Sequence, residues 1–196
     1  MHSEATTANH RYPAILMVLH WLTFMLVTLA YALAELKGFT DRGSNLRAAM
    51  LHLHYLNGLL VFTLTWVRLA LRTSASVPVS QPIPPRWLRL AAMSIHIVLY
   101  TILIALPLLG WLALSAKADP VHLFFFDLPL APIDLDPALA RPLRTWHARI
   151  ANAGYALIGL HAAAALIHHY VLRDNALVRM LPLLHQRLPN PVKKMK

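Results

Sequence analysis

Four long runs of this 196-residue chain contain no aspartate, glutamate, lysine or arginine. The runs cover residues 12–34, 48–67, 90–116 and 150–172, so they are 23, 20, 27 and 23 residues long. A helix needs about 20 predominantly apolar residues to cross the hydrocarbon core of a bilayer. Each run is therefore long enough to span a membrane, and four spans leave little of the chain for a separate soluble domain.

We therefore predict an all-α fold, an integral membrane bundle of four transmembrane helices that forms a single domain over residues 1–196. The expected helices cover about 12–35, 47–71, 88–116 and 143–172, and a basic tail follows at 173–196. The first run exceeds the length of about 7–15 residues that is typical of a signal-peptide core, so we expect a retained helix. The proline-rich connection at 117–141 shows no strand pattern, and we expect it to cap the bundle at the membrane interface.

The composition agrees with a membrane location. Hydrophobic residues make up 58% of the chain and charged residues 13%, where ordinary soluble domains carry about 25% charged residues. The absence of cysteine excludes disulfides, thiolate-bound iron–sulfur clusters, cysteine zinc sites, covalently attached c-type haem and a cysteine nucleophile. The net charge is +10, but the basic residues lie between apolar runs, which favours membrane lipid headgroups over nucleic acid as partners.

The distribution of lysine and arginine predicts the orientation of the bundle. Eleven of them lie in the N-terminal segment, at the second connection and in the tail, whereas seven lie on the opposite side. Because basic residues accumulate on the cytoplasmic side of bacterial membrane proteins, we expect both termini in the cytoplasm and a location in the inner membrane.

Histidines dominate the polar content of the four runs. An ionisable side chain inside a membrane is costly, and its default interpretation is functional. A single buried histidine is more often a packing residue, but so many of them make a purely structural explanation weak. Seven lie within the runs and an eighth immediately precedes the last run: His20, His52, His54, His96, His161, His168, His169 and His147.

Their depths sort four of these histidines into two layers. His147 and His161 are fourteen residues apart, which places them about 40° apart around a helix and about 21 Å apart along it. Counted along their own runs, His54 matches the depth of His147 and His20 matches that of His161. Two imidazoles on facing helices at one depth can hold a haem iron axially. Two such pairs predict two haems stacked across the membrane.

Glycines and arginines accompany the predicted ligands. Gly154 lies midway between His147 and His161, and Gly58 follows His54 by one turn. Such glycines allow a flat macrocycle to approach the backbone, or else they allow close helix packing, and both interpretations stay open. Arg68 and Arg144 share faces with His54 and His147 and could pair with haem propionates or simply anchor the helices at the interface.

The remaining histidines have less defined roles. His52 faces about 200° away from His54, so both cannot bind one iron, and we choose His54 because Gly58 and Arg68 share its face. His96 competes with His20 for the inner site. His168 lies seven residues beyond His161, a position that suits quinone binding or proton donation, and His169 could do the same or reach toward water.

Several motifs resemble the bacterial cytochrome b561 family over nearly the whole chain. The resemblance is most specific in the run IGLHAAAALIHHY at 158–170, and it extends to His20-Trp21, Ala105-Leu106-Pro107 with Gly110, Trp146-His147, Asp174-Asn175 and Arg179-Met180-Leu181-Pro182. It implies a four-helix inner-membrane protein with two b-type haems. By position, the resemblance places the iron ligands on His20, His54, His147 and His161, the four that the depth argument selects.

The resemblance also implies an activity, because members of this family oxidise periplasmic superoxide and reduce ubiquinone. Two axial histidines leave no open coordination position, so outer-sphere transfer of one electron is the expected chemistry. A basic rim would steer the superoxide anion inward, opposed by four aspartates of the third connection. The rim residues are Arg42, Arg47, Arg141, Arg144 and Arg149, of which Arg144 and Arg149 are the chosen steering residues.

Two other functions stay open. Related cytochromes serve as electron-transfer subunits that link a partner dehydrogenase or hydrogenase to the quinone pool, and such a chain would have a redox partner protein. A membrane transporter or metal-binding module could also use the same histidines. Haem content separates the transporter or metal-binding module from the two redox functions.

Overall fold

The computed structural model describes residues 12–75, 84–118, 121–123 and 126–181. Within these ranges the chain forms four long helices: α1 (Ala14–Leu36), α2 (Asn45–Ser74), α3 (Arg86–Ala116) and α4 (Ala140–Tyr170). Their bounds lie within three residues of the ranges expected from the sequence. Each helix is long and apolar enough to cross a membrane, so the predicted four-helix membrane bundle is confirmed.

The helix ends follow from local sequence signals. Pro13 and Pro85 immediately precede α1 and α3, where the missing amide hydrogen and fixed backbone angle of proline are well tolerated. The Ser44 side chain caps α2 by accepting a hydrogen bond from the Arg47 amide at 3.2 Å. Arg47 also donates to the carbonyl of Lys37 at 2.6 Å, which joins α2 to the short 3₁₀ helix η1 (Lys37–Phe39).

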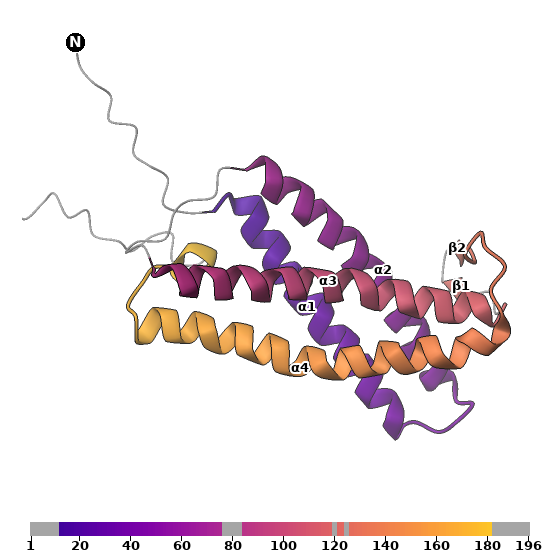
Figure 1. Cartoon of the computed structure of the whole chain (residues 1–196). Helices are drawn as coiled ribbons and strands as arrows, with labels where there is room; N and C mark the ends of the chain where they lie inside the picture. Colours follow the sequence, from indigo (N-terminus) through magenta and orange to yellow (C-terminus); the bar gives the residue numbers. More distant parts are fainter. Residues whose placement is uncertain (1–11, 76–83, 119–120, 124–125, 182–196) are drawn as a thin grey trace, which may run out of the picture.

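The helices form two antiparallel pairs that cross each other. Helix α1 packs along α2 and α3 packs along α4, and Figure 1 shows the first pair running obliquely across the second. We call the end where α1 and α3 begin and α2 and α4 finish the terminal end, and the opposite end the hairpin end. The two ends lie at the left and right of Figure 1.

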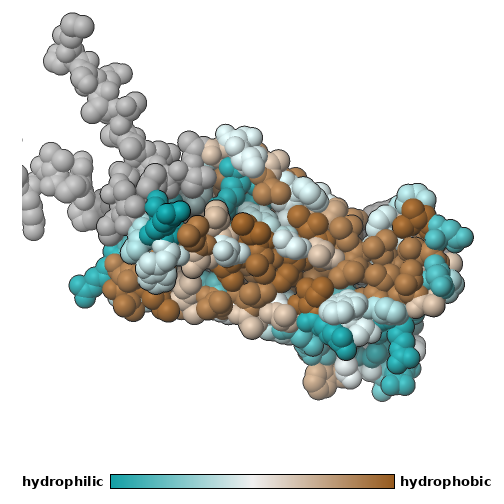
Figure 2. Space-filling model, viewed as in Figure 1, coloured by the Kyte–Doolittle hydropathy of each residue, from teal (hydrophilic) through white to brown (hydrophobic). Residues whose placement is uncertain are grey.

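Large apolar side chains cover the outside of the bundle. None of the most apolar stretch of α3 is buried inside the protein, and Ile97 and Leu160 keep 57% and 60% of their surface exposed. Figure 2 shows this apolar surface over the middle of the bundle, with polar residues nearer its ends. Lipid tails can cover such a surface without loss of backbone hydrogen bonds, because every span is helical.

The third connection contains a small β-hairpin that the sequence analysis missed. Strand β1 (Val121–Leu123) pairs antiparallel with β2 (Phe126–Leu128), with Val121 opposite Leu128. Strands of three residues are too short to show an alternating pattern, so the expectation of no strand here was wrong. A 3₁₀ turn, η2 (Pro137–Leu139), then leads into α4, and the Asp136 side chain caps it.

The chain after α4 folds back against the terminal end. A third 3₁₀ helix, η3 (Val178–Met180), ends the described part of the tail. The Trp21 indole nitrogen donates to the carbonyl of Met180 at 2.8 Å, and the Arg179 guanidinium lies over the Tyr12 ring at 5.2 Å. The rest of the predicted basic tail, 182–196, lies outside the described residues.

Candidate functional site

Two histidine pairs face each other across the bundle. The ring centres of His20 on α1 and His161 on α4 are 6.3 Å apart. Those of His54 on α2 and His147 on α4 are 6.2 Å apart. Helix α4 thus contributes one imidazole to a pair near each end. The structure brings together the residues that the sequence analysis paired.

The spacing within each pair suits a metal ion between two imidazoles. With a metal–nitrogen bond of about 2 Å and a ring nitrogen about 1.2 Å from its ring centre, two axial imidazoles lie with centres about 6.4 Å apart. Both observed pairs match this separation. The donors are nitrogens alone, which agrees with a haem iron held by two histidines.

Backbone carbonyls orient the pair near the hairpin end. The Nδ1 atom of His54 lies 3.1 Å from the Ala30 carbonyl, and that of His147 lies 2.8 Å from the Leu106 carbonyl. A carbonyl only accepts, so each Nδ1 carries the hydrogen and donates it. The Nε2 lone pairs are then available to a metal, which is the usual arrangement of metal-binding histidines.

Helix α3 packs closely against His147. A Cβ added at Gly110 would lie 3.5 Å from the Nδ1 and Cε1 atoms of the His147 ring, which is ordinary van der Waals contact, so the imidazole lies beside the backbone of α3 at this position. Pro107, one turn earlier inside α3, has no amide hydrogen for the carbonyl of the preceding turn and locally weakens the helix. Both residues belong to the family-like motif, but the sequence alone assigned neither a role.

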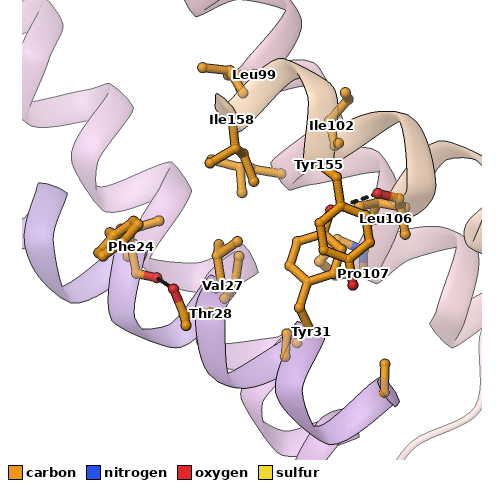
Figure 3. A pocket seen from close by; sticks show the side chains of 18 of the residues that line it. Phe24, Val27, Thr28, Tyr31, Leu99, Ile102, Leu106, Pro107, Tyr155 and Ile158 are labelled. Atoms are coloured by element: carbon orange, nitrogen blue, oxygen red, sulfur yellow. Dashed lines mark hydrogen bonds between the residues drawn. The ribbon is translucent and has the colours of Figure 1, made fainter. Parts of the chain in front are cut away.

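One cavity connects the two pairs. It has a volume of about 610 Å³ and all four helices line it, including His20, His54, His147 and His161, which lies within the range of about 300–1,000 Å³ typical of cofactor sites. Figure 3 shows its central wall, where Phe24 and Val27 of α1 face Leu99 and Ile102 of α3 and Ile158 of α4. An apolar wall with polar groups at the ends suits a flat hydrophobic ring that carries carboxylates.

The two glycines of the predicted site have different surroundings. Gly58 lines the cavity, and no atom lies within 4 Å of a Cβ built there, which leaves space for a macrocycle. A Cβ at Gly154 would instead collide with the Tyr31 hydroxyl, which donates to the Ala151 carbonyl at 2.7 Å. Gly154 also lines the cavity, and its missing side chain leaves the space that the Tyr31 hydroxyl of α1 occupies, which favours the packing interpretation.

Two tyrosines that the sequence analysis did not single out lie between the histidine pairs. The rings of Tyr31 and Tyr155 have centres 4.2 Å apart, and Figure 3 shows them together in the cavity. The Tyr155 hydroxyl donates to the Glu35 carboxylate at 3.0 Å. Glu35 is the one acid among the described residues that line the cavity, and Lys37 and Arg144 line the cavity at the same, hairpin end.

A cationic side chain, Arg68, lines the terminal end of the cavity. The Arg68 guanidinium lies 5.7 Å from the centre of the Tyr100 ring, and both residues line the cavity. No carboxylate in the described ranges forms an ion pair with Arg68. The Tyr100 hydroxyl is buried and has no hydrogen-bond partner in the part of the chain that the structure describes. This corner can bind an anionic group such as a propionate.

The structure keeps His96 as a competitor for the terminal-end pair. Its ring centre lies 5.2 Å from that of His161, and its Nδ1 is 2.5 Å from the Ala92 carbonyl. The Nδ1 of His20 is buried without a partner in the described residues. His52 does not line the cavity, and His169 packs against Tyr170 with ring centres 4.7 Å apart.

Two residues of the predicted site lie outside the cavity. Arg149 does not line it and instead lies over the exposed Trp146 ring, 5.4 Å from its centre. His168 does not line it either, and its Nδ1 contacts the Asp174 carboxylate at 2.5 Å. Helix spacing predicts the contact of Arg149 with Trp146, three residues earlier on α4, but not the contact of His168 with Asp174, which depends on the chain reversal after α4.

A four-helix membrane bundle with two facing histidine pairs is the architecture of a membrane cytochrome b. Residues 11–183 match the family model described as prokaryotic cytochrome b561. The chain is 37% identical over 174 residues to cytochrome b561 homolog 1 of Escherichia coli, covering 88% of this chain and 98% of that protein. It is 35% identical over 175 residues to a probable superoxide oxidase of Yersinia pestis, covering 89% and 97%.

A third relative, cytochrome b561 homolog 2 of Escherichia coli, is 29% identical over 179 residues and is covered to 94%. The chain belongs to the prokaryotic cytochrome b561 family. It is an electron-transfer protein of the membrane, and its family implies a b-type haem. The nitrogen-only donor set and the apolar cavity of this structure fit that cofactor.

A glycine substitution tests the packing interpretation of Gly154. We expect Gly154→Ala to lower the free energy of unfolding by about 1–3 kcal/mol through overpacking against Tyr31. The matched control is Gly159→Ala on the same helix, where a Cβ meets no atom within 4 Å, and we expect it to be neutral or slightly stabilising. Thermal unfolding in detergent measures both.

A second background isolates the contact with Tyr31. In Tyr31→Phe, which lacks the hydroxyl, we expect Gly154→Ala to cost less than it does in the wild-type protein. An equal cost in both backgrounds would contradict the contact. Loss of haem with unchanged stability would restore the macrocycle interpretation.

Proposed function

We propose that this protein binds two b-type haems and carries electrons across the bacterial inner membrane from superoxide to ubiquinone. The observation that supports this most directly is the pair of facing imidazoles near each end of one membrane-spanning cavity. The printed name of one relative, a probable superoxide oxidase, supports the choice of donor. Two superoxide anions lose one electron each and leave as O₂, while ubiquinone takes up both electrons and two protons.

Four histidines would hold the haem irons in this proposal. His54 and His147 would bind one haem near the hairpin end, and His20 and His161 the other near the terminal end. Haem supplies one-electron chemistry, and two axial nitrogens leave no open coordination position. Arg68, which lines the cavity, would bind a propionate of the terminal-end haem, and Gly58, where a Cβ meets no atom within 4 Å, would leave room for the haem beside His54.

The hairpin end supplies the proposed entrance for superoxide. Lys37, Arg144 and Glu35 line the cavity at this end, where we propose that it opens. Two cations against one carboxylate leave a positive opening, which attracts a small anion. Arg47 is engaged with the carbonyls of Lys37 and Thr40 and orders this loop. Arg149 lies over Trp146 outside the cavity, which favours Lys37 over Arg149 as the second steering residue.

The terminal end would then face the cytoplasm and bind ubiquinone. The charge asymmetry of the sequence supports this orientation. His161 reaches the cavity near this end, and His168 lies about two turns further along α4. His168 is the group that we propose to interact with the quinone, outside the haem cavity.

The first experiment is a reduced-minus-oxidised spectrum of the purified protein, with haem and metals quantified per chain. The proposal expects two low-spin b-type haems per chain. Co-purification with a stoichiometric iron–sulfur or nickel protein would favour the alternative of an electron-transfer subunit for a dehydrogenase or hydrogenase. A colourless protein from haem-replete cells that binds zinc or copper would contradict both redox functions.

Histidine substitutions test the ligand assignment. We expect His54→Ala and His147→Ala each to remove the same single haem, and His20→Ala and His161→Ala each to remove the other, because one imidazole cannot hold the iron alone. Haem quantification and spectra of the four variants measure this. His96→Ala is the matched control and should keep both haems. Loss of the terminal-end haem in His96→Ala but not in His20→Ala would move the ligand to α3.

Charge reversals test the superoxide entrance. At low salt we expect Arg144→Glu and Lys37→Glu to lower kcat/KM for superoxide about tenfold, because they reverse the attraction at the opening. Arg149→Glu, the control outside the cavity, should change it little. The difference should shrink as ionic strength rises. Equal rates in all three variants would contradict steering at this opening.

A further inference from the structure

A buried carboxylate contacts His168 at the terminal end of α4. The Nδ1 atom of His168 and the Oδ2 atom of Asp174 are 2.5 Å apart, and the two side chains are 15% and 4% exposed. It is the one histidine–carboxylate ion pair among the residues that the structure describes. The contact lies outside the cavity that contains the histidine pairs.

The backbone after α4 reverses so that Asp174 returns to His168. Helix α4 ends at Tyr170, and the amides of Val171 and Leu172 both donate to the Ile167 carbonyl. Arg173 then adopts a left-handed conformation with φ +53°, which is unfavourable for a residue other than glycine. This conformation lets the Asp174 amide donate to the His168 carbonyl at 3.0 Å.

The Asp174 side chain is fixed on both of its oxygens. Its Oδ1 accepts from the Ala176 amide at 2.9 Å, while its Oδ2 faces the His168 ring. The carboxylate therefore cannot turn away from the imidazole without losing the hydrogen bond from the Ala176 amide.

The Asp174 carboxylate determines which ring nitrogen of His168 carries the fixed hydrogen. An ionised carboxylate only accepts hydrogen bonds, so the Nδ1 of His168 must carry a hydrogen and donate it. Proton exchange is then confined to Nε2, the other ring nitrogen. A carboxylate that fixes the tautomer and orientation of a histidine in this way is a known device of proton-transfer sites.

We propose that Asp174 is a positioning residue that fixes His168 so that its Nε2 gives a proton to a carbonyl oxygen of the bound quinone. This inference rests on the proposed reduction of ubiquinone. His168 is seven residues from His161, which is about 10 Å along the helix. Protons would thus be supplied about two turns beyond His161, the proposed ligand of the haem that would reduce the quinone.

The proton step balances with the electron step. Ubiquinone gains two electrons and two protons, and each reduced carbonyl oxygen becomes a hydroxyl group. His168, protonated on both nitrogens, transfers the Nε2 proton to one quinone oxygen and becomes neutral. Its Nδ1 keeps its own hydrogen and continues to donate it to the Asp174 carboxylate. Solvent water supplies the second proton and later returns one to Nε2, which the partial exposure of His168 allows.

The test compares Asp174→Asn and His168→Gln with two matched controls. Asparagine keeps the shape of Asp174 but can donate to Nδ1, which selects the wrong imidazole form. The control Trp21→Phe breaks the tie to Met180 without touching the pair, and His169→Gln removes the neighbouring imidazole. Haem content, thermal unfolding and steady-state kinetics with superoxide and a short-chain ubiquinone are measured for every variant.

We expect Asp174→Asn and His168→Gln to lower kcat for quinone reduction about 10–100-fold, as is typical of residues that orient a functional histidine. KM for quinone should change little in Asp174→Asn, and haem content and haem reduction by superoxide without quinone should stay at wild-type levels in both variants. The double variant should be no slower than either single one, because the two residues act as a unit. Trp21→Phe and His169→Gln should keep the wild-type kcat.

Two results would overturn the proposal. Wild-type kcat in Asp174→Asn or His168→Gln, measured on a protein with full haem content, would show that the pair does not serve quinone reduction. A loss of kcat in Trp21→Phe equal to that in Asp174→Asn would show that the pair only stabilises the fold of this segment. A stopped-flow control tests the proposed function separately from the role of Asp174. If short-chain ubiquinone fails to oxidise the reduced wild-type protein, both the proposed function and the role of Asp174 are overturned.

Discussion

A buried imidazole nitrogen is costly without a partner, and inside a lipid-enclosed bundle that partner must come from the protein or its cofactor. Near the hairpin end this requirement ties the helices of each pair together. His54 reaches from α2 to the Ala30 carbonyl of α1, and His147 reaches from α4 to the Leu106 carbonyl of α3. Each bond joins the two helices of one pair. With Nδ1 satisfied in this way, the two Nε2 atoms are left facing the space between the pairs, where a metal can satisfy them.

The bundle separates polar groups by position along its axis. Lys37, Arg144 and Glu35 line the cavity at its hairpin end, while Arg68 and Tyr100 lie toward the terminal end of the same cavity. Apolar side chains line the wall between them. His168 and Asp174 lie beyond the cavity, on the far side of His161. In the function that we propose, the anion entrance, the electron path and the proton donor therefore occupy different places.

Much of this site was predictable from spacing along single helices. The fourteen residues between His147 and His161 already require two layers, and a helix cannot turn one of them away without turning the other. Contacts between helices were not predictable in the same way. Periodicity places Arg144 and Arg149 about 140° apart around α4, but only the rotation of α4 in the bundle decides that Arg144 is the one that lines the cavity. Gly154 likewise admits Tyr31, a residue more than a hundred positions away.

The sequence by itself determined the membrane class, the four spans, the nitrogen-only chemistry and the two histidine levels, because charge exclusion and helical periodicity are local properties of a chain in lipid. Tertiary structure alone decided which carbonyls orient His54 and His147, that Gly110 packs beside His147, and that Asp174 returns to His168. Those contacts depend on helix rotation, helix crossing and a single left-handed residue at Arg173. Periodicity along one helix carries no information about any of these three.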